Sequence, residues 1–187
     1  RANIKRVLAQ KKRIKEKIRQ MEVEVGRYLA DGQGINENAL SLYITPNPRN
    51  LTKANKALIK ILVDKIGEEG VNPYSLAMNA VQVSNSKNRF LDFDFDLKKG
   101  KTFNKLPEIF WELPQSCFHL VKTRGGLHAL VLPEEAVKHD KMFYKKIMQP
   151  NEDFEVMSNT TGLIPICGCR QSDYSPFLLK LEMMEWV

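Results

Sequence analysis

Apolar residues in the first third of the chain recur with helical spacing. Over residues 1–30 the intervals alternate between three and four, with one lysine in the series: Ile4, Val7, Lys11, Ile14, Ile18, Met21, Val25 and Tyr28. This heptad-like seam predicts one long amphipathic helix. Two further helices are predicted, one at 52–66 with Thr52 as its N-cap and one at 73–83.

The rest of the pattern mixes short strands with short helices. Apolar or alternating runs predict strands within 89–100 and at 39–45, 116–123, 127–133, 162–169 and 175–182. Residues 106–113 and 134–148 have helical spacing instead. Because this order lacks a regular β-α-β repeat and includes a hairpin, it predicts an α+β fold rather than a doubly wound parallel sheet.

The stretch RFLDFDFDLKKG alternates charged and aromatic residues. On a strand, Asp92, Asp94 and Asp96 share one face, while Phe93 and Phe95 point to the opposite, buried face. Three carboxylates in a row repel one another, and a divalent cation removes that conflict. Hard oxygen ligands favour Mg²⁺ or Mn²⁺ over zinc. The alternative is an exposed acidic strand face that protects a sheet edge.

The stretch TRGGLHALV predicts a hairpin with a phosphate-binding character. Arg124, Gly125 and Gly126 form its turn, where glycine permits positive φ and close approach to the backbone. His128 begins the returning strand, and Lys122 adds positive charge near the same turn. Histidine, arginine and free backbone N–H groups together can hold a triphosphate. The alternative is a structural histidine on a strand.

The net charge of +7 is concentrated at one end of the chain. Residues 1–20 carry nine Lys or Arg and one acid, a net of +8, and the other 167 residues sum to −1. The sequence pI of 9.3 is therefore not by itself evidence for a nucleic-acid-binding domain. The basic helix either packs on the body or a partner with a solvated face, or follows a phosphate backbone.

Composition limits the class of protein and the compartment in which it is expected. The mean hydropathy is −0.36, and no run of about 18 apolar residues is present, so we expect no membrane-spanning helix. Three cysteines, Cys117, Cys167 and Cys169, argue against a disulfide scaffold and for a reducing compartment, which we expect to be the cytoplasm. The chain begins at Arg1 rather than Met, and we expect it to be a piece of a longer protein.

Three features in this order resemble the archaeo-eukaryotic primase superfamily. LDFDFD resembles its first motif, TRGGLH its second, and PICGCRQSDYSP a later turn from which Arg170 emerges. LYITPNPRN, followed by a helix, resembles the opening strand and Asn-Pro-Arg loop of the primase-polymerase branch, which is found in plasmids, phages, mobile elements and CRISPR-associated loci. The resemblance covers residues 39–182.

The resemblance implies a split architecture. An N-terminal αβ unit at 35–88 packs on an RRM-like unit at 89–187, with the active site in the cleft between them. Together they form a catalytic core at 35–187, preceded by a basic amphipathic helix at 1–34. The zinc-binding insertion of many primases is not expected, because three scattered cysteines cannot build it.

The resemblance also implies site residues for template-directed nucleotidyl transfer. Two Mg²⁺ or Mn²⁺ ions are held by Asp92 and Asp94, with Asp96 as a further ligand, and a third carboxylate on a later strand is Asp153 or Glu155. His128 binds the phosphates of the incoming nucleotide. The implied helpers in nucleotide binding are Lys122, Arg124, Arg170 and Arg49, the last of which approaches nucleotide or template.

The implied enzyme is a DNA primase, a DNA polymerase or both. Its partners are a single-stranded DNA template, a primer and dNTP or NTP, with no membrane, and a helicase or other replication or defence domain in the same longer chain. Two alternatives stay open. One is a metal-dependent phosphatase or nuclease, although a haloacid-dehalogenase-type phosphatase needs a hydroxyl residue where Asp96 stands. The other is a non-catalytic nucleic-acid-binding initiator module of the same fold.

Overall fold

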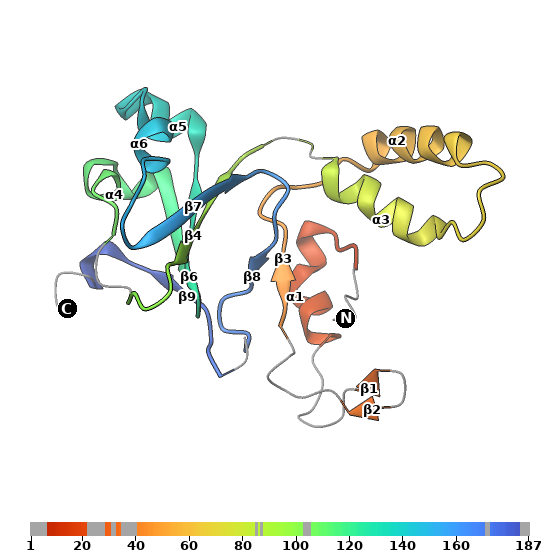
Figure 1. The fold of residues 1–187 in the computed structure, drawn as a ribbon, viewed down its shortest axis with the longest axis horizontal. Coiled ribbons are helices and arrows are strands. Elements are labelled where there is room, and N and C mark those ends of the chain that lie inside the picture. The colour runs from red at the N-terminus through yellow and green to blue at the C-terminus, as the bar shows by residue number, and fades with distance from the viewer. Residues whose placement is uncertain are drawn as a thin grey trace.

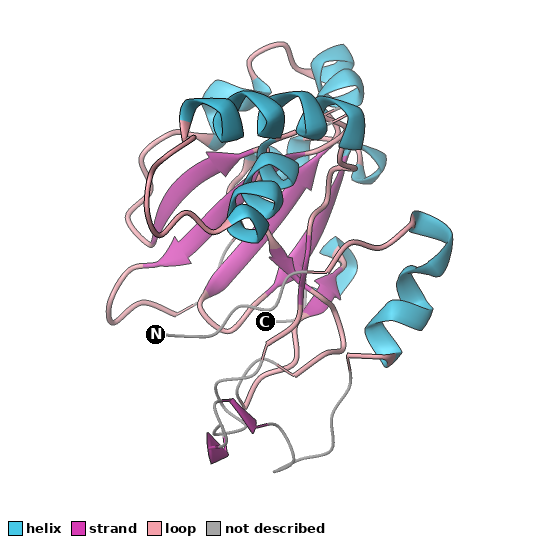
Figure 2. Cartoon of the chain, turned by 90° about the vertical axis from the view of Figure 1, so that its right-hand side faces the viewer, coloured by secondary structure: helices cyan, strands magenta, loops and turns pink. Residues whose placement is uncertain are grey.

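A five-stranded antiparallel sheet forms the centre of the protein (Figures 1 and 2). The computed structural model describes residues 7–21, 29–30, 33–34, 41–84, 86, 88–102, 106–170 and 173–183. The sheet has the order β7-β4-β6-β5-β9 and is built from β4 (Leu91–Leu97), β5 (Phe118–Lys122), β6 (Gly126–Val131), β7 (Phe154–Asn159) and β9 (Phe177–Leu179). Helices and antiparallel strands together confirm the predicted α+β class.

The first four strands of the sheet alternate with helices in a β-α-β-β-α-β order. α4 (Ile109–Glu112) connects β4 to β5, and α5 (Pro133–His139) with α6 (Phe143–Ile147) connects β6 to β7. Although β4 is first in sequence, it lies between β6 and β7 and pairs with both along nearly its whole length. The acidic strand is therefore central in the sheet and not a sheet edge.

One face of the sheet carries the hydrophobic core. Phe93 and Phe95 are completely buried there, under side chains from α4, α5 and α6. The ring of Phe95 meets those of Phe110 and Phe154 edge-on, each at 5.9 Å between centroids. Burial of each phenylalanine contributes about 2 kcal/mol as an upper estimate. Since side chains alternate along a strand, this packing turns the aspartates of β4 to the other face.

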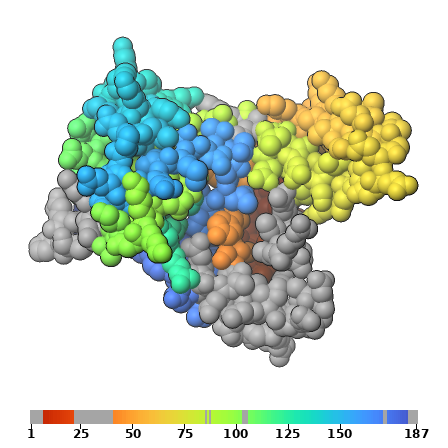
Figure 3. All heavy atoms as spheres, in the orientation of Figure 1, coloured from red at the N-terminus to blue at the C-terminus, as the bar shows by residue number. Residues whose placement is uncertain are grey.

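Residues before the sheet form a second unit, and the segment that follows β7 pairs with it. β3 (Tyr43–Ile44) pairs antiparallel with β8 (Ile164–Pro165), which follows β7 in sequence. α2 (Leu51–Asp64) and α3 (Pro73–Val83) form a helical hairpin that projects from the body, in yellow in Figure 3. Figure 1 shows β3, β8 and this hairpin on the opposite side of the sheet from α4, α5 and α6.

Asparagine side chains cap both helices of the hairpin. The Oδ1 atom of Asn50 accepts a hydrogen bond from the Lys53 N–H at 2.9 Å, and Oδ1 of Asn72 accepts one from the Ser75 N–H at 3.1 Å. The predicted cap at Thr52 is therefore wrong by two residues, because Asn50 takes that role and Thr52 lies inside the helix. No helix in the described part of the chain has the length and apolar character to cross a membrane.

A buried amide joins the two units. Asn47 has no exposed surface. Its Nδ2 donates to the carbonyls of Phe90 at 2.8 Å and Thr160 at 3.2 Å, and its Oδ1 accepts from the Phe90 N–H at 2.8 Å. The loop before α2 is thereby fixed to the residue that precedes β4 and to the loop that follows β7.

Replacing Asn47 with alanine is expected to cost about 3 kcal/mol of unfolding free energy. Three hydrogen bonds are lost, and the backbone groups of Phe90 and Thr160 are left buried without that partner. Urea denaturation checks this, with Asn55→Ala on the exposed surface of α2 as the matched control. Equal stability of the two variants would show that the amide does not join the units.

The predicted first helix is much shorter than its pattern suggests. Helical structure is observed at η1 (Lys11–Arg13) and α1 (Ile14–Arg19), while residues 7–10 are not helical. Neither segment buries a residue, and short helices without tertiary packing are marginal in water. The parts of this prediction at 1–6 and 22–28 lie outside the described residues.

Two other predicted helical boundaries are corrected. Leu29–Ala30 (β1) pairs with Gln33–Gly34 (β2), so the expected helix does not extend to residue 30. The helix expected at 134–148 is two helices, α5 and α6. The backbone of Asp140 is extended, and its Oδ1 accepts from the Met142 N–H at 2.7 Å, which ends one helix and starts the next.

Candidate active site

The three aspartates of β4 lie on the sheet face opposite the core, as their alternation predicts. Their exposure increases along the strand: Asp92 is only 2% exposed, Asp94 is half-buried and Asp96 is exposed. Asp92 is thus the carboxylate most removed from water. An ionised group in that position requires a positive or hydrogen-bonding partner.

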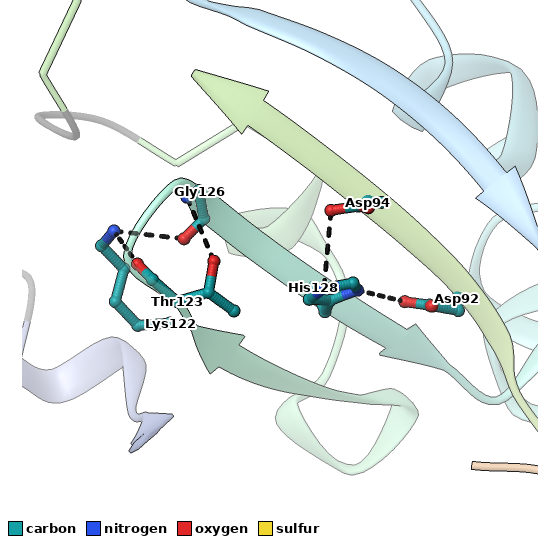
Figure 4. A network of polar contacts seen from close by, with 6 residues as sticks. All are labelled: Asp92, Asp94, Lys122, Thr123, Gly126 and His128. Atoms are coloured by element: carbon teal, nitrogen blue, oxygen red, sulfur yellow. Dashed lines mark hydrogen bonds and ion pairs between the residues drawn. The ribbon is translucent and has the colours of Figure 1, made fainter. Parts of the chain in front are cut away.

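His128 is that partner, and it comes from the neighbouring strand. The register of β4 and β6 pairs His128 with Asp94. Its Nδ1 lies 3.1 Å from Oδ1 of Asp92, and its Nε2 lies 3.6 Å from Oδ1 of Asp94 (Figure 4). The two motifs LDFDFD and TRGGLH therefore meet in one cluster, with the imidazole between two carboxylates.

The cluster changes the protonation of its members. Burial by itself lowers the pKa of His128, but the hydrogen bond and charge of Asp92, with the charges of Asp94 and Asp96, outweigh it and raise that pKa above 6.5. The pKa of Asp94 is also raised, chiefly by burial and further by the neighbouring aspartates, although the charge of His128 opposes the shift. His128 therefore keeps its proton to higher pH than a free imidazole, and when protonated it supplies positive charge between the two aspartates.

The stability of the metal-free protein is expected to fall as pH rises above 6.5. The folded state holds the proton of His128 to higher pH than the unfolded state, so its stabilisation is complete below 6.5 and disappears through the raised folded pKa. Asp94 also lowers the stability as pH rises. Because its pKa is raised in the folded state, this loss begins above the ordinary value of 3.8, at lower pH than the loss from His128. Urea denaturation in a chelator, across about pH 6 to 9, should show this slope.

A matched pair of variants isolates the contribution of His128 to that slope. His128→Gln should flatten the pH dependence, whereas His139→Gln, an exposed histidine of α5, should leave it unchanged. The assignment fails if both variants retain the slope of the wild-type protein.

The loop after β7 closes over Asp92. Asn159, the last residue of β7, lies directly opposite Asp92 in the register. Its Oδ1 accepts from the N–H and the hydroxyl of Thr161, at 2.8 and 3.1 Å. A Cβ atom at Gly162 would lie 3.3 Å from Oδ2 of Asp92 and 3.1 Å from Nδ2 of Asn159. A small residue at 162 therefore keeps room beside the second carboxylate oxygen.

Arg49 reaches the same loop from the second unit. Its Nη2 donates to the carbonyl of Thr161 at 3.0 Å. Its Nε and Nη1 are buried and have no hydrogen-bond acceptor among the described residues, and burial lowers the pKa of the guanidinium. Buried donors without acceptors are costly, and those of a cation most of all. Arg49 thus holds two buried, unpaired donor nitrogens next to the loop that closes over Asp92.

The two candidates for a third carboxylate lie at the other end of β7. Glu155 shares the face of the aspartates and lies opposite Asp96, which makes it a diagonal neighbour of Asp94 at about 7–8 Å. Asp153 precedes the strand and forms an ion pair with Lys101 at 2.9 Å. The structure brings Glu155 to the edge of the site and does not bring Asp153 to it.

The other predicted nucleotide-binding residues are spread around the hairpin. Lys122 pairs with the buried Leu127 and so faces away from His128, and its Nζ donates to the carbonyls of Thr123 and Gly126 at 2.8 and 3.1 Å (Figure 4). Arg124 is exposed and lies 3.5 Å from Asp173. Arg170 is exposed in the loop between β8 and β9.

Gly126 is required by close packing and not by a left-handed backbone. Neither Gly125 nor Gly126 has a positive φ, so the expectation that this turn uses glycine for its left-handed conformation is wrong. A Cβ atom at Gly126 would lie 1.8 Å from the carbonyl oxygen of Phe95 on β4. Glycine here lets β6 approach β4 closely enough to align His128 with Asp94.

The donor atoms of the cluster suit a hard divalent cation. Asp92 and Asp94 offer carboxylate oxygens two residues apart on one face, and the amide of Asn159 lies opposite Asp92. Within the described residues, no three His, Cys, Asp or Glu side chains are grouped as ligands of one metal ion.

Comparison of the chain with protein-family models, curated proteins and solved structures found no match.

Proposed function

We propose that the protein is a template-directed nucleotidyltransferase, a DNA primase or polymerase of the archaeo-eukaryotic primase kind. It joins a nucleoside triphosphate to a 3′-hydroxyl and releases pyrophosphate. The observation that carries the proposal is the cluster of Asp92, Asp94 and His128 on the sheet face that is turned away from the core. Two carboxylates, one imidazole and the unpaired donors of Arg49 suit a nucleoside triphosphate with its cations.

The topology supports the same proposal. The last strand of the β-α-β-β-α-β unit lies beside the first, and the third lies between the first and the second. This strand order is that of RRM-like and ferredoxin-like units. The resemblance implies an αβ unit packed on such a sheet, with the active site between them. We assign β3, β8 and the α2–α3 hairpin to that second unit in this proposal.

Each side chain has a role in the proposed reaction. Asp92 and Asp94 would hold the divalent cations, which would activate the 3′-oxygen and offset charge on the α-phosphate. His128 balances Asp92 through Nδ1, and its Nε2, which lies 3.6 Å from Asp94, could donate to a phosphate oxygen once a cation takes Asp94. Arg49, which holds the loop after β7 through the carbonyl of Thr161, would donate its unpaired N–H groups to a phosphate. These groups orient the nucleotide and stabilise charge that develops in the transition state.

Extension of a labelled primer on a single-stranded template tests the proposal. With Mn²⁺ or Mg²⁺ and nucleoside triphosphates, the chain should lengthen the primer, and a chelator should abolish the product. Absence of extension together with absence of metal-dependent nucleotide binding would exclude the function.

A second candidate is a non-catalytic nucleotide- or nucleic-acid-binding module of the same fold. The observation that favours it is the composition of β7, where Asn159 lies opposite Asp92 and Met157 opposite Asp94, so neither position carries a charge. Calorimetry of nucleotide binding with and without Mn²⁺ distinguishes the two. Binding that ignores the metal supports the module, whereas binding that requires it supports the enzyme.

A further inference from the structure

An exposed aromatic side chain lies on the site face, two strands from Asp92. His119 on β5 pairs with Leu130 on β6, and Leu130 pairs with Asp92 on β4, so the three residues form one row across the sheet. Neighbouring strands are about 4.8 Å apart, which places the backbones of His119 and Asp92 about 10 Å apart. His119 is exposed, whereas Leu130 between them is 7% exposed.

Two residues that precede β4 complete an aromatic cluster with His119. The ring centroids of Phe90 and His119 are 6.0 Å apart, with an angle of 59° between the ring planes. The guanidinium carbon of Arg89 lies 5.7 Å from the centroid of the Phe90 ring. Arg89 is exposed and Phe90 is half-buried. We call these three residues, Arg89, Phe90 and His119, the aromatic cluster.

The cluster is fixed in place before any ligand binds. Asn47 bonds both the N–H and the carbonyl of Phe90, and Asn47 itself is completely buried. His119 is fixed by the ladder between β5 and β6. Groups that are already ordered lose little conformational entropy on binding, so their contacts contribute more to affinity. The backbones that carry Phe90 and His119 are thus held by hydrogen bonds to the rest of the fold.

We propose that the aromatic cluster is the nucleobase platform of the active site, with the base of the incoming nucleoside triphosphate stacked on His119 and Phe90. The inference rests on the proposed function, because it takes the phosphate site to lie at Asp92, Asp94 and His128. A nucleotide placed along the row of Asp92, Leu130 and His119 carries its phosphates at one end and its base at the other.

The chemistry of the cluster suits any base. Stacking on an aromatic ring uses the π-face that every base has, so it gives affinity without strict sequence preference. Arg89 adds a cation beside the same rings. Purine nucleotides, which stack over a larger area, gain more from the platform than pyrimidine nucleotides.

Isothermal calorimetry with Mn²⁺ tests the platform on the full chain. The titrants are the four nucleoside triphosphates and inorganic tripolyphosphate, which has the phosphates but no base. His119→Ala and Phe90→Leu should weaken triphosphate binding by about tenfold or more, with a larger loss for purines. Both should bind tripolyphosphate as the wild-type protein does, which also shows that they are folded. His139→Ala, an exposed histidine on α5, is the matched control.

The possible results separate the platform from the function. If the wild-type protein binds nucleotides and both variants bind them equally well, the platform is wrong and the function stands. Equal affinity of the wild-type protein for tripolyphosphate and nucleotides also overturns the platform. So does a loss of template binding in His119→Ala with unchanged nucleotide binding. A wild-type protein that binds neither titrant overturns the platform and the proposed function together.

Discussion

Primer extension is expected to fall by about a thousandfold or more when Asp92 and Asp94 are both replaced by asparagine. The amides keep the size of the carboxylates but remove two negative charges from the position where the proposed cations would be held. Loss of about 4 kcal/mol of transition-state stabilisation corresponds to a factor of about 10³ in rate. Initial rates on a primed template, in Mn²⁺ and in Mg²⁺, measure the effect.

Folding of this double variant should be largely preserved. The amide introduced by Asp92→Asn retains an oxygen that can accept the hydrogen bond from His128, so the row across β4 and β6 loses charge but not its shape. Asp64→Asn at the end of α2 changes an exposed carboxylate in the same way and serves as the control for rate. Undiminished synthesis by the double variant would remove Asp92 and Asp94 from the mechanism.

The Gly126→Ala change is expected to destabilise the protein by about 3 kcal/mol. Its Cβ would lie 1.8 Å from the Phe95 carbonyl oxygen and 2.9 Å from the carbonyl carbon, and both are backbone atoms of the central strand. No rotamer change relieves such a contact, so β4 and β6 must separate. Thermal unfolding should show a decrease in Tm of about 10 °C.

The adjacent glycine provides a matched control for this effect. Gly125 has no atom within 4 Å of an added Cβ and no positive φ, so Gly125→Ala should change the unfolding free energy by about 0.5 kcal/mol or less. Gly126→Ala should also weaken nucleotide binding, whereas Gly125→Ala should not, because separation of β4 from β6 also separates His128 from the aspartates. Similar stability of the two variants would contradict the packing role of Gly126.

Of the three aspartates that share one face of β4, the structure provides a neighbouring imidazole for two. His128 lies between Asp92 and Asp94 and, when protonated, supplies a positive charge from the chain itself. Asp96 has no such partner on β6, where Gly126 lies opposite, and on β7 it faces Glu155. Two carboxylates directly opposite each other destabilise a sheet. Their exposure to water limits that cost.

Some features of the site were missed because they depend on contacts between distant segments. The residue pattern did not predict β7 as a strand, because Val156 and Met157 are adjacent and break the alternation; only the resemblance implied a later strand with Asp153 or Glu155. The place of β7 beside β4 is what puts Asn159 opposite Asp92. From the sequence, Asn47 was predicted only to lie in a loop. That prediction says nothing about its hydrogen bonds to Phe90 and Thr160.

The sequence by itself determined which side chains share a face. Strand geometry has a period of two, so the alternation of Asp92 and Asp94 with Phe93 and Phe95 placed carboxylates on one side and the core on the other. Only the tertiary structure decided which strands are neighbours. Partners that are tens of residues apart are selected by burial of the shared apolar face, a global property that no local pattern contains. That selection placed His128 between the two aspartates.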